Sequence, residues 1–259
     1  MLTHKRLGRD PKRVLAISDC HVPRHDPPTW NIFLRAIRDL KPDGVWIVGD
    51  FVDLSSVNRH EKAPGDTFTL KQEEDAGNAA LDQISVALGK RAVELLYVDG
   101  NHEDRLRRYI ASGRCPPELR DRIEDIPETL RLRDRGWRYV HPDDQPCYPF
   151  DRFALFHGKW YPKHHAAKHA DVLACSGLYG HTHRPQVYTT QNVHGTVVMT
   201  GMPCSRRLVA EWEHQRTAPF NGWLTGFAVV EVMSRRPHVY PVLVQNGEAA
   251  YGGHSWRGR

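Results

Sequence analysis

The 259-residue sequence predicts an α/β fold, because strand-length apolar runs alternate with segments of helical spacing. The runs Val14–Ile17, Val45–Val48 and Val93–Val98 are short, apolar and bounded by polar residues, which is typical of buried strands. A helix is predicted between each pair of runs, over Thr29–Leu40 and over Leu70–Leu88. This strand–helix–strand order favours parallel strands joined by right-handed crossovers.

The two predicted helices have recognisable starts or ends. In the first, Trp30, Phe33 and Ile37 fall at helical spacing, and Pro42 follows its last turn. The second is preceded by Thr69, with Gln72 placed three residues later as the partner in a capping box. Further strands are predicted near Trp137–Val140, Phe153–Phe156, Leu173–Tyr179, Val187–Thr190, Val197–Thr200, Leu224–Val232 and His238–Val244.

Five short clusters of Asp, His and Asn recur along the chain in a fixed order. They are Asp19-Cys20-His21, Gly49-Asp50-Phe51-Val52-Asp53, Gly100-Asn101-His102-Glu103, His157-Gly158 and Gly180-His181-Thr182-His183. Four of them directly follow an apolar run, so they lie at the carboxyl ends of predicted strands, where open α/β sheets place their sites. Each cluster alone is weak evidence of function, whereas the ordered set strongly indicates one site.

The residue types in these clusters indicate a metal site. Asp19 and His21 are two residues apart, as are His181 and His183, so in an extended segment each pair points the same way. Mixed oxygen and nitrogen ligands suit Mn, Fe, Zn, Ni or Co better than calcium, which takes oxygen. The set exceeds what one catalytic zinc needs, and two ions roughly 3.5–4 Å apart would use all of it.

The ordered motifs resemble those of the calcineurin-like metallophosphoesterase family. That family's string reads Asp-x-His, Gly-Asp-x-x-Asp, Gly-Asn-His-(Asp/Glu), His, Gly-His-x-His, and every element is present between residues 14 and 183. The resemblance implies a calcineurin-like metallophosphoesterase fold, in which two packed mixed β-sheets are flanked by helices as an α/β/β/α sandwich. The chain's length and organisation predict a single domain over residues 1–259, and its short loops also resemble those of small phage and bacterial members.

The same resemblance implies a role for each site residue. Asp19, His21 and His183 hold one divalent ion, Asn101, His157 and His181 hold the other, and Asp50 bridges the two. His102 is a general acid that Asp53 orients. Mn is the first expectation for the two ions, which together activate a bridging water for attack on a phosphate ester. His102 then protonates the leaving oxygen.

An Arg-rich stretch between Arg105 and Arg138 follows the third motif. It holds ten Arg against six acids, an excess of positive charge close to that of the whole chain, which is +5. It is interpreted either as a lid over the site, at about residues 105–136, or as a solvated helical pair with internal ion pairs. Arg105 is the first candidate for a phosphate contact, because guanidinium forks suit phosphate.

The substrate is predicted less sharply than the chemistry. The second motif resembles that of Ser/Thr protein phosphatases, which continue with a phosphate-binding Arg, whereas Leu54 follows here. We therefore expect a phosphodiesterase acting on nucleotides or nucleic-acid ends, and Trp160 and Tyr161 are candidates to flank a nucleobase. A phosphoprotein or small-molecule phosphomonoesterase, and a non-enzymatic binding module, are the alternatives.

Composition fits a cytoplasmic enzyme. Hydrophobic residues make up 40% of the chain, enough for a core, and no apolar stretch is long enough to span a bilayer. The first residues, Met1 to Arg13, lack the apolar centre of a signal peptide. Five scattered cysteines argue against a disulfide framework, and Cys20 is predicted to pack away from the ions. No membrane partner is expected, and no oligomeric state is predicted.

Overall fold

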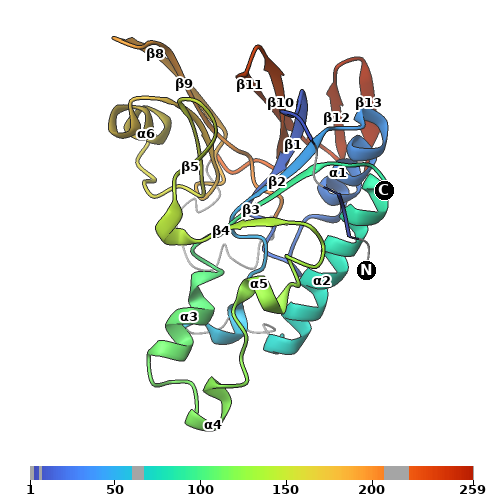
Figure 1. Ribbon diagram of the computed structural model, residues 1–259, viewed down its shortest axis with the longest axis vertical. Helices are drawn as coiled ribbons and strands as arrows, with labels where there is room; N and C mark the ends of the chain where they lie inside the picture. Colours follow the sequence, from blue (N-terminus) through green and yellow to red (C-terminus); the bar gives the residue numbers. More distant parts are fainter. Residues whose placement is uncertain (1–2, 6–7, 60–66, 207–221, 259) are drawn as a thin grey trace.

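The computed structural model describes residues 3–5, 8–59, 67–206 and 222–258, and its main feature is a pair of β-sheets (Figure 1). The larger sheet has the strand order β11-β10-β1-β2-β3-β4. Strands β1 to β4 run parallel, and β10 pairs antiparallel with both β1 and β11. Its strands are β1 (Arg13–Ile17), β2 (Gly44–Val48), β3 (Glu94–Val98), β4 (Arg138–Val140), β10 (Gly226–Met233) and β11 (Arg236–Leu243).

The second sheet has five strands in the order β5-β6-β7-β9-β8. β6 and β7 are parallel, as are β7 and β9, while the outer pairs are antiparallel. These strands are β5 (Cys147–Phe150), β6 (Phe153–Phe156), β7 (Ser176–Tyr179), β8 (Gln186–Asn192) and β9 (Gly195–Gly201). A separate hairpin joins β12 (Glu248–Tyr251) to β13 (His254–Arg257).

Two long helices, α1 (Pro27–Leu40) and α2 (Leu70–Leu88), were both predicted and are confirmed. Asp26 caps α1 through its side chain, which accepts from the Thr29 amide at 2.9 Å. The capping box of α2 is formed as predicted: the Thr69 amide donates to Gln72 Oε1 at 2.9 Å, and the Gln72 amide donates to Thr69 Oγ1 at 3.3 Å. Local sequence signals therefore define where α1 and α2 begin.

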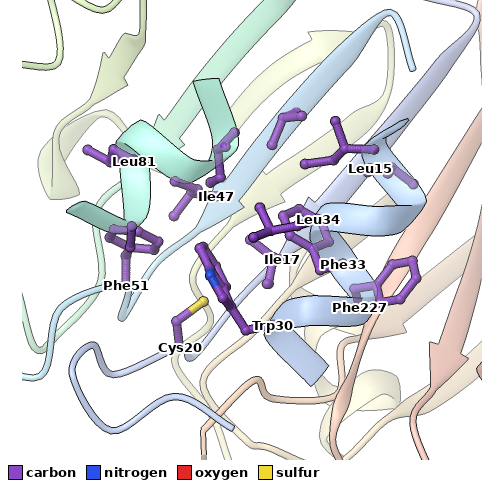
Figure 2. Close-up of a cluster of buried hydrophobic side chains, with 14 of the residues drawn as sticks. Leu15, Ile17, Cys20, Trp30, Phe33, Leu34, Ile47, Phe51, Leu81 and Phe227 are labelled. Atoms are coloured by element: carbon purple, nitrogen blue, oxygen red, sulfur yellow. The ribbon is translucent and has the colours of Figure 1, made fainter. Parts of the chain in front are cut away.

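Three buried clusters separate the layers. The first lies between the larger sheet and the two long helices, where Trp30 and Phe33 of α1 pack on Ile17 and Ile47 (Figure 2). The second lies between the sheets, and it includes Trp46 from β2 and Phe153 from β6. The third packs helix α6 (His165–Leu173) on the outer face of the second sheet. The order of layers is therefore helix, sheet, sheet, helix, which confirms the expected sandwich.

Several predicted boundaries were wrong. The strand predicted over Leu173–Tyr179 begins only at Ser176, because Leu173 is the last residue of α6 and Ala174 ends that helix in a left-handed conformation with φ 50°. Strands β5, β12 and β13 were not predicted. The β12–β13 hairpin had a signal, since Gly252 and Gly253, with φ 57° and 82°, form the Gly-Gly pair that tight hairpin turns favour.

The Arg-rich stretch forms three short helices, α3 (Asp104–Ala111), α4 (Pro117–Arg120) and α5 (Ile126–Thr129). α3 and α4 extend away from the sheets (Figure 1). Arg107 of α3 pairs with Asp99, directly after β3, at 2.6 Å, and with Asp125, directly before α5, at 3.0 Å. Internal ion pairs are therefore present, as one interpretation expected, and the lid role remains a prediction.

All five cysteines are free, as predicted, and Cys20 is fully buried in the core between sheet and helices. Among the residues that the structure describes, no helix combines the length and the apolar character needed to cross a membrane.

Candidate metal centre

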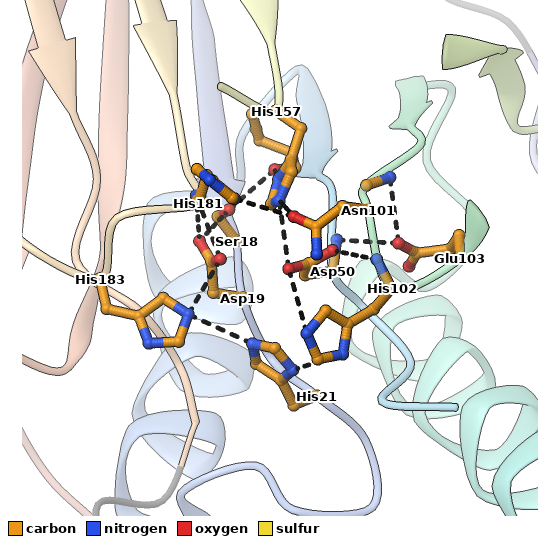
Figure 3. A network of polar contacts seen from close by, with 12 residues as sticks. Ser18, Asp19, His21, Asp50, Asn101, His102, Glu103, His157, His181 and His183 are labelled. Carbon is orange, nitrogen blue, oxygen red and sulfur yellow. Dashed lines mark hydrogen bonds and ion pairs between the residues drawn. The ribbon is translucent and has the colours of Figure 1, made fainter. Parts of the chain in front are cut away.

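The five motifs meet at one edge of the two sheets (Figure 3). Asp19 follows β1, Asp50 follows β2 and Asn101 follows β3, while His157 follows β6 and His181 follows β7. Parallel strands place their carboxyl ends at one edge, so side chains far apart in sequence converge there. All residues predicted for the site therefore come together, including the second-motif and third-motif residues Asp53 and His102.

The expectation of extended backbone in the paired motifs was wrong. Asp19 and His21 have φ of 52° and 51°, and His181 and His183 have φ of 70° and 57°. Positive φ is uncommon for residues other than glycine and is often found at functional sites. Backbone bonds hold these turns, since the Asp19 amide donates to the Gly49 carbonyl and the His21 amide to the Asp50 carbonyl, both at 3.0 Å. Tight left-handed turns, and not strand alternation, aim these side chains inward.

One group of donors consists of Asp19, His21 and His183, all buried. His183 Nε2 lies 3.2 Å from Asp19 Oδ1 and 3.2 Å from His21 Nε2. One donor atom from each of the three residues lies within 4.8 Å of the others. Two imidazole nitrogens and a carboxylate oxygen facing one point suit a divalent transition-metal ion.

A second group surrounds Asp50, His157 and His181, and Asn101 adds an amide oxygen. His157 Nε2 is 3.1 Å from both Asp50 Oδ2 and Asn101 Oδ1. His181 Nδ1 lies 2.8 Å from the same Asn101 oxygen. Asp50 also shares a third group with His21 and His102, so its carboxylate lies between the two clusters. These contacts fit a pair of cations with Asp50 between them.

Ionisation of the carboxylates favours cation binding. Burial alone would raise the pKa of Asp19, but the neighbouring His183 more than offsets it and the pKa is about 2. Burial would also raise the pKa of Asp50, but His102 and His157 outweigh it and hold the carboxyl pKa well below its usual value. Burial, followed by the nearby imidazole of His102, lowers the pKa of His21 to about 3. At neutral pH the site therefore offers charged carboxylates together with a neutral His21.

His157 behaves differently from the other imidazoles. Burial lowers its pKa, but Asp50 and Asp19 raise it to about 10. At neutral pH His157 is therefore protonated, and its positive charge lies beside Asp50, where a bound cation would lie. Metal ligands must be deprotonated, so cation binding here is expected to release a proton.

His102 and Asp53, which the resemblance implies are an acid and its orienting carboxylate, are in contact. His102 Nδ1 lies 3.0 Å from Asp53 Oδ1, while His102 Nε2 is 3.7 Å from Asp50 Oδ2. Asp53 Oδ1 is also 3.0 Å from His21 Nδ1, and its other oxygen is 2.9 Å from Arg24 Nε. Asp53 therefore contacts two imidazoles, an arrangement that the sequence did not reveal.

Arg105 lies beside the proposed acid. Its Nη2 is 2.7 Å from His102 Nε2, and its Nη1 donates to the Asp53 carbonyl at 2.9 Å. Half-buried at the rim, it is placed where a phosphate contact is feasible.

Sequence reasoning assigned no role to Glu103, the last residue of the third motif. Its buried carboxylate accepts from the amides of Gly100 and Asp50 at 3.0 Å each, and of Phe51 at 2.7 Å. The Tyr97 hydroxyl donates to it at 2.8 Å. Glu103 thus ties the loop after β2 to the loop after β3, and its place within the motif was the available signal.

Two glycines are needed for the close approach of these loops. A Cβ on Gly49, where φ is 79°, would lie 2.2 Å from His157 Nδ1. A Cβ on Gly180 would lie 1.9 Å from Ser18 Oγ, which donates to Asp19 at 2.6 Å. Any side chain at either position would displace a proposed ligand.

A model of the calcineurin-like phosphoesterase family matches residues 12–185, and the chain belongs to this family. The Gene 54 protein of Mycobacterium phage D29 is 24% identical over 257 residues, covering 95% of this chain and 98% of the phage protein.

Among solved structures, vacuolar protein sorting 29 of Cryptosporidium parvum is 13% identical, with a TM-score of 0.46 over 96% of this chain and 100% of that one. The nuclease MPE of Pseudomonas putida is 16% identical, with a TM-score of 0.35 over 88% and 87% of the two chains. The family assignment rests on the family model alone.

Proposed function

We propose that the chain is a two-metal phosphodiesterase acting on nucleotides or nucleic-acid ends. The observation that carries this proposal is the meeting of two donor groups at the buried carboxylate of Asp50. In the proposal, Asp19, His21 and His183 hold one cation, Asn101, His157 and His181 hold the other, and Asp50 contacts both. Mn is the first choice, with Fe, Zn, Ni and Co as alternatives.

When bound, two such cations neutralise the charge of a phosphate ester and lower the pKa of a coordinated water. The chain's own contribution is proton delivery. The main-chain carbonyl of Asp53 lies 2.9 Å and its carboxylate 3.0 Å from His102 Nδ1, which leaves Nε2 as the nitrogen for the leaving oxygen. In the structure Nε2 accepts from Arg105, so a protonated Nε2 requires the Arg105 guanidinium to turn away, and an anionic substrate provides its new partner.

Preference for a diester is supported by Leu54. This residue stands where the resembled phosphatases place a phosphate-binding Arg, and it is only 2% exposed. A nucleotide substrate is supported by a cavity of about 530 Å³ that opens beside Asn101 and His157. Trp160 and Phe156 line it, and an apolar, aromatic wall suits a nucleobase.

The experiment compares hydrolysis of bis(p-nitrophenyl) phosphate and p-nitrophenyl phosphate by the Mn²⁺-loaded protein, followed by cyclic-nucleotide and single-stranded DNA and RNA substrates. We expect activity on the diester to match or exceed activity on the monoester. A strong monoester preference would reverse the assignment in favour of a phosphomonoesterase. That alternative has one supporting observation, since Arg105 beside His102 suits the additional negative charge of a monoester.

A cytoplasmic location is part of the proposal, because five free cysteines suit a reducing compartment.

A further inference from the structure

A second, smaller cavity shares Asn101 and Arg108 with the cavity of about 530 Å³, and its walls are rich in arginine. It encloses about 190 Å³, and four of its lining residues are Arg59, Arg105, Arg108 and Arg114. Val57, Asn58 and Asn101 complete the lining, so none of the described residues that line this space is acidic. Arg108 pairs with Asp104 at 2.5 Å, but Asp104 lies outside the lining. The cavity therefore carries a concentrated positive charge.

Arg114 holds the walls of this cavity in place. Its Nη1 donates to the Asn58 carbonyl and its Nη2 to the Val57 carbonyl, both at 3.2 Å. The guanidinium also lies 5.4 Å from the centre of the Tyr109 ring. These contacts join α3 to the segment after the second motif. The walls are thus held by specific bonds, while Arg59 and Arg108 present exposed side chains to the opening.

The position of the cavity indicates which part of the substrate it would contact. Asn101 lines the cavity and belongs to the second donor cluster, and Arg105 joins the cavity to His102 by the 2.7 Å contact. If His102 protonates the leaving oxygen, as proposed above, the group attached to that oxygen departs on the side of His102. The arginine-lined cavity is therefore the space next to the leaving group.

The side chains that line the cavity indicate which class of ligand it would bind. Guanidinium groups form paired hydrogen bonds with phosphate oxygens. A volume of about 190 Å³ suits a small anion better than a nucleobase, for which the neighbouring 530 Å³ cavity has room and an aromatic wall. The two cavities thus differ in both size and polarity, one suited to phosphate and the other to a base.

We propose that the arginine-lined cavity is a subsite for a second phosphate group, carried by the leaving part of the substrate. This inference rests on the proposed function and narrows it: the preferred substrate bears a phosphate beyond the one that is cleaved, as an oligonucleotide or a terminally phosphorylated nucleotide does. Arg59 and Arg108 bind that phosphate, and Arg114 positions the wall that carries Arg59.

The test uses a thymidine dinucleotide with one internal phosphate, and the same dinucleotide with an additional phosphate at its 5′ end or at its 3′ end. The two ends distinguish a leaving O3′ from a leaving O5′. With the Mn²⁺-loaded protein at constant ionic strength, one of the two phosphorylated substrates should have a KM about tenfold lower than the plain dinucleotide. In the Arg59→Ala/Arg108→Ala protein this KM ratio should fall to within about twofold of unity.

Arg122→Ala is the matched control, since it removes an exposed arginine of the same stretch that lies outside the cavity lining. It should keep the full KM ratio. Cleavage of the plain dinucleotide with no gain from either added phosphate would overturn the subsite and leave the proposed function standing. A ratio that survives in the double variant would also overturn it. Failure to cleave any diester would overturn the proposed function and the subsite together.

Discussion

Among single residues, Asp50 lies between the two groups of metal donors. Its Oδ2 lies 3.1 Å from His157 Nε2, and its Oδ1 accepts from the His102 amide at 2.8 Å. A shared carboxylate lets two cations lie close together, because its negative charge offsets their repulsion. Replacing that one carboxylate should therefore damage both proposed sites.

Asp50→Asn should weaken binding of both cations and lower phosphodiester hydrolysis by about 10²–10³-fold or more. The amide keeps the shape of the side chain but removes its charge. Metal content per chain and kcat with bis(p-nitrophenyl) phosphate measure the two effects. Asp75→Asn, which changes an exposed carboxylate on α2, serves as the control. Two tightly bound ions and normal turnover in Asp50→Asn would show that Asp50 does not bridge.

His102 has two possible roles in the geometry, since it could also join Asp50 and His21 as a metal ligand. As an acid, it should contribute about 10²–10⁴-fold, and only where the leaving group needs a proton. His102→Ala should then keep both cations and lose much more activity on nucleoside diesters than on p-nitrophenyl esters. His164→Ala, at an exposed position, is the matched control. Loss of a cation, or equal losses on both ester types, would assign His102 as a ligand.

Asp53→Asn should give a milder form of the same leaving-group dependence, because it would only misorient the His102 imidazole. The structure adds a second expectation, since Asp53 Oδ1 is equally close to His21 Nδ1. The variant should also weaken the cation held by Asp19, His21 and His183. Titration with Mn²⁺ would show one weakened site and one normal site. If both sites kept their affinity for Mn²⁺, the role of Asp53 would be limited to orienting His102.

At the level of secondary-structure elements, the loops that follow β2 and β3 determine how the proposed ligands are placed. The sequence could predict that these loops carry ligands, because each follows an apolar run of strand length. It could not predict how they are joined, since the bonds from Glu103 to the amides of Asp50 and Phe51 connect residues about fifty positions apart. Nor could it predict the left-handed turns, because positive φ is uncommon even for Asp and His, the residue types in which it is enriched.

Glu103→Gln should lower the free energy of unfolding by about 2–3 kcal/mol. Burial and the charge of Asp50 raise the pKa of Glu103, but its amide donors still need two acceptor oxygens, and glutamine offers only one. Urea unfolding in the presence of a chelator isolates this effect from metal binding. Glu118→Gln, at an exposed position in α4, is the control. Equal unfolding midpoints for Glu103→Gln and the unmodified chain would contradict the role.

Across the whole molecule, the layered architecture follows from alternation along β1 and β2. Leu15 and Ile17 face the helices, whereas Val14 and Ala16 face the second sheet. The sequence shows these strands as continuous apolar runs, which predicts burial on both faces but not which layer covers each face. The resemblance to the phosphoesterase motifs supplied the order of layers. Residues of β8 alternate between half-buried and exposed, so its sequence provides only a weak signal for the layer it belongs to.

The outer layer around α6 should make stability depend on pH. His165 is 1% exposed and its Nδ1 lies 2.5 Å from the Tyr179 hydroxyl. Burial, followed by His169 and Arg184, lowers its pKa to about 4. The unfolded chain takes up a proton at this side chain near pH 6.5, whereas the folded chain does not until about pH 4. Stability from neutral His165 is therefore complete above pH 6.5 and is lost progressively as the pH falls from 6.5 to about 4, by on the order of 2 kcal/mol.

Thermal unfolding in a chelator between pH 7.5 and pH 4 measures this loss. Other histidines with lowered pKa values, such as the buried His21 and the half-buried His181, contribute in the same direction, so the informative quantity is the difference between variants. His165→Gln cannot take up the proton and should show a smaller fall in Tm than the unmodified chain. His164→Gln, at the exposed neighbouring position, should fall as far as the unmodified chain does. Parallel Tm curves for His165→Gln and the unmodified chain would mean that protonation of His165 does not destabilise the fold.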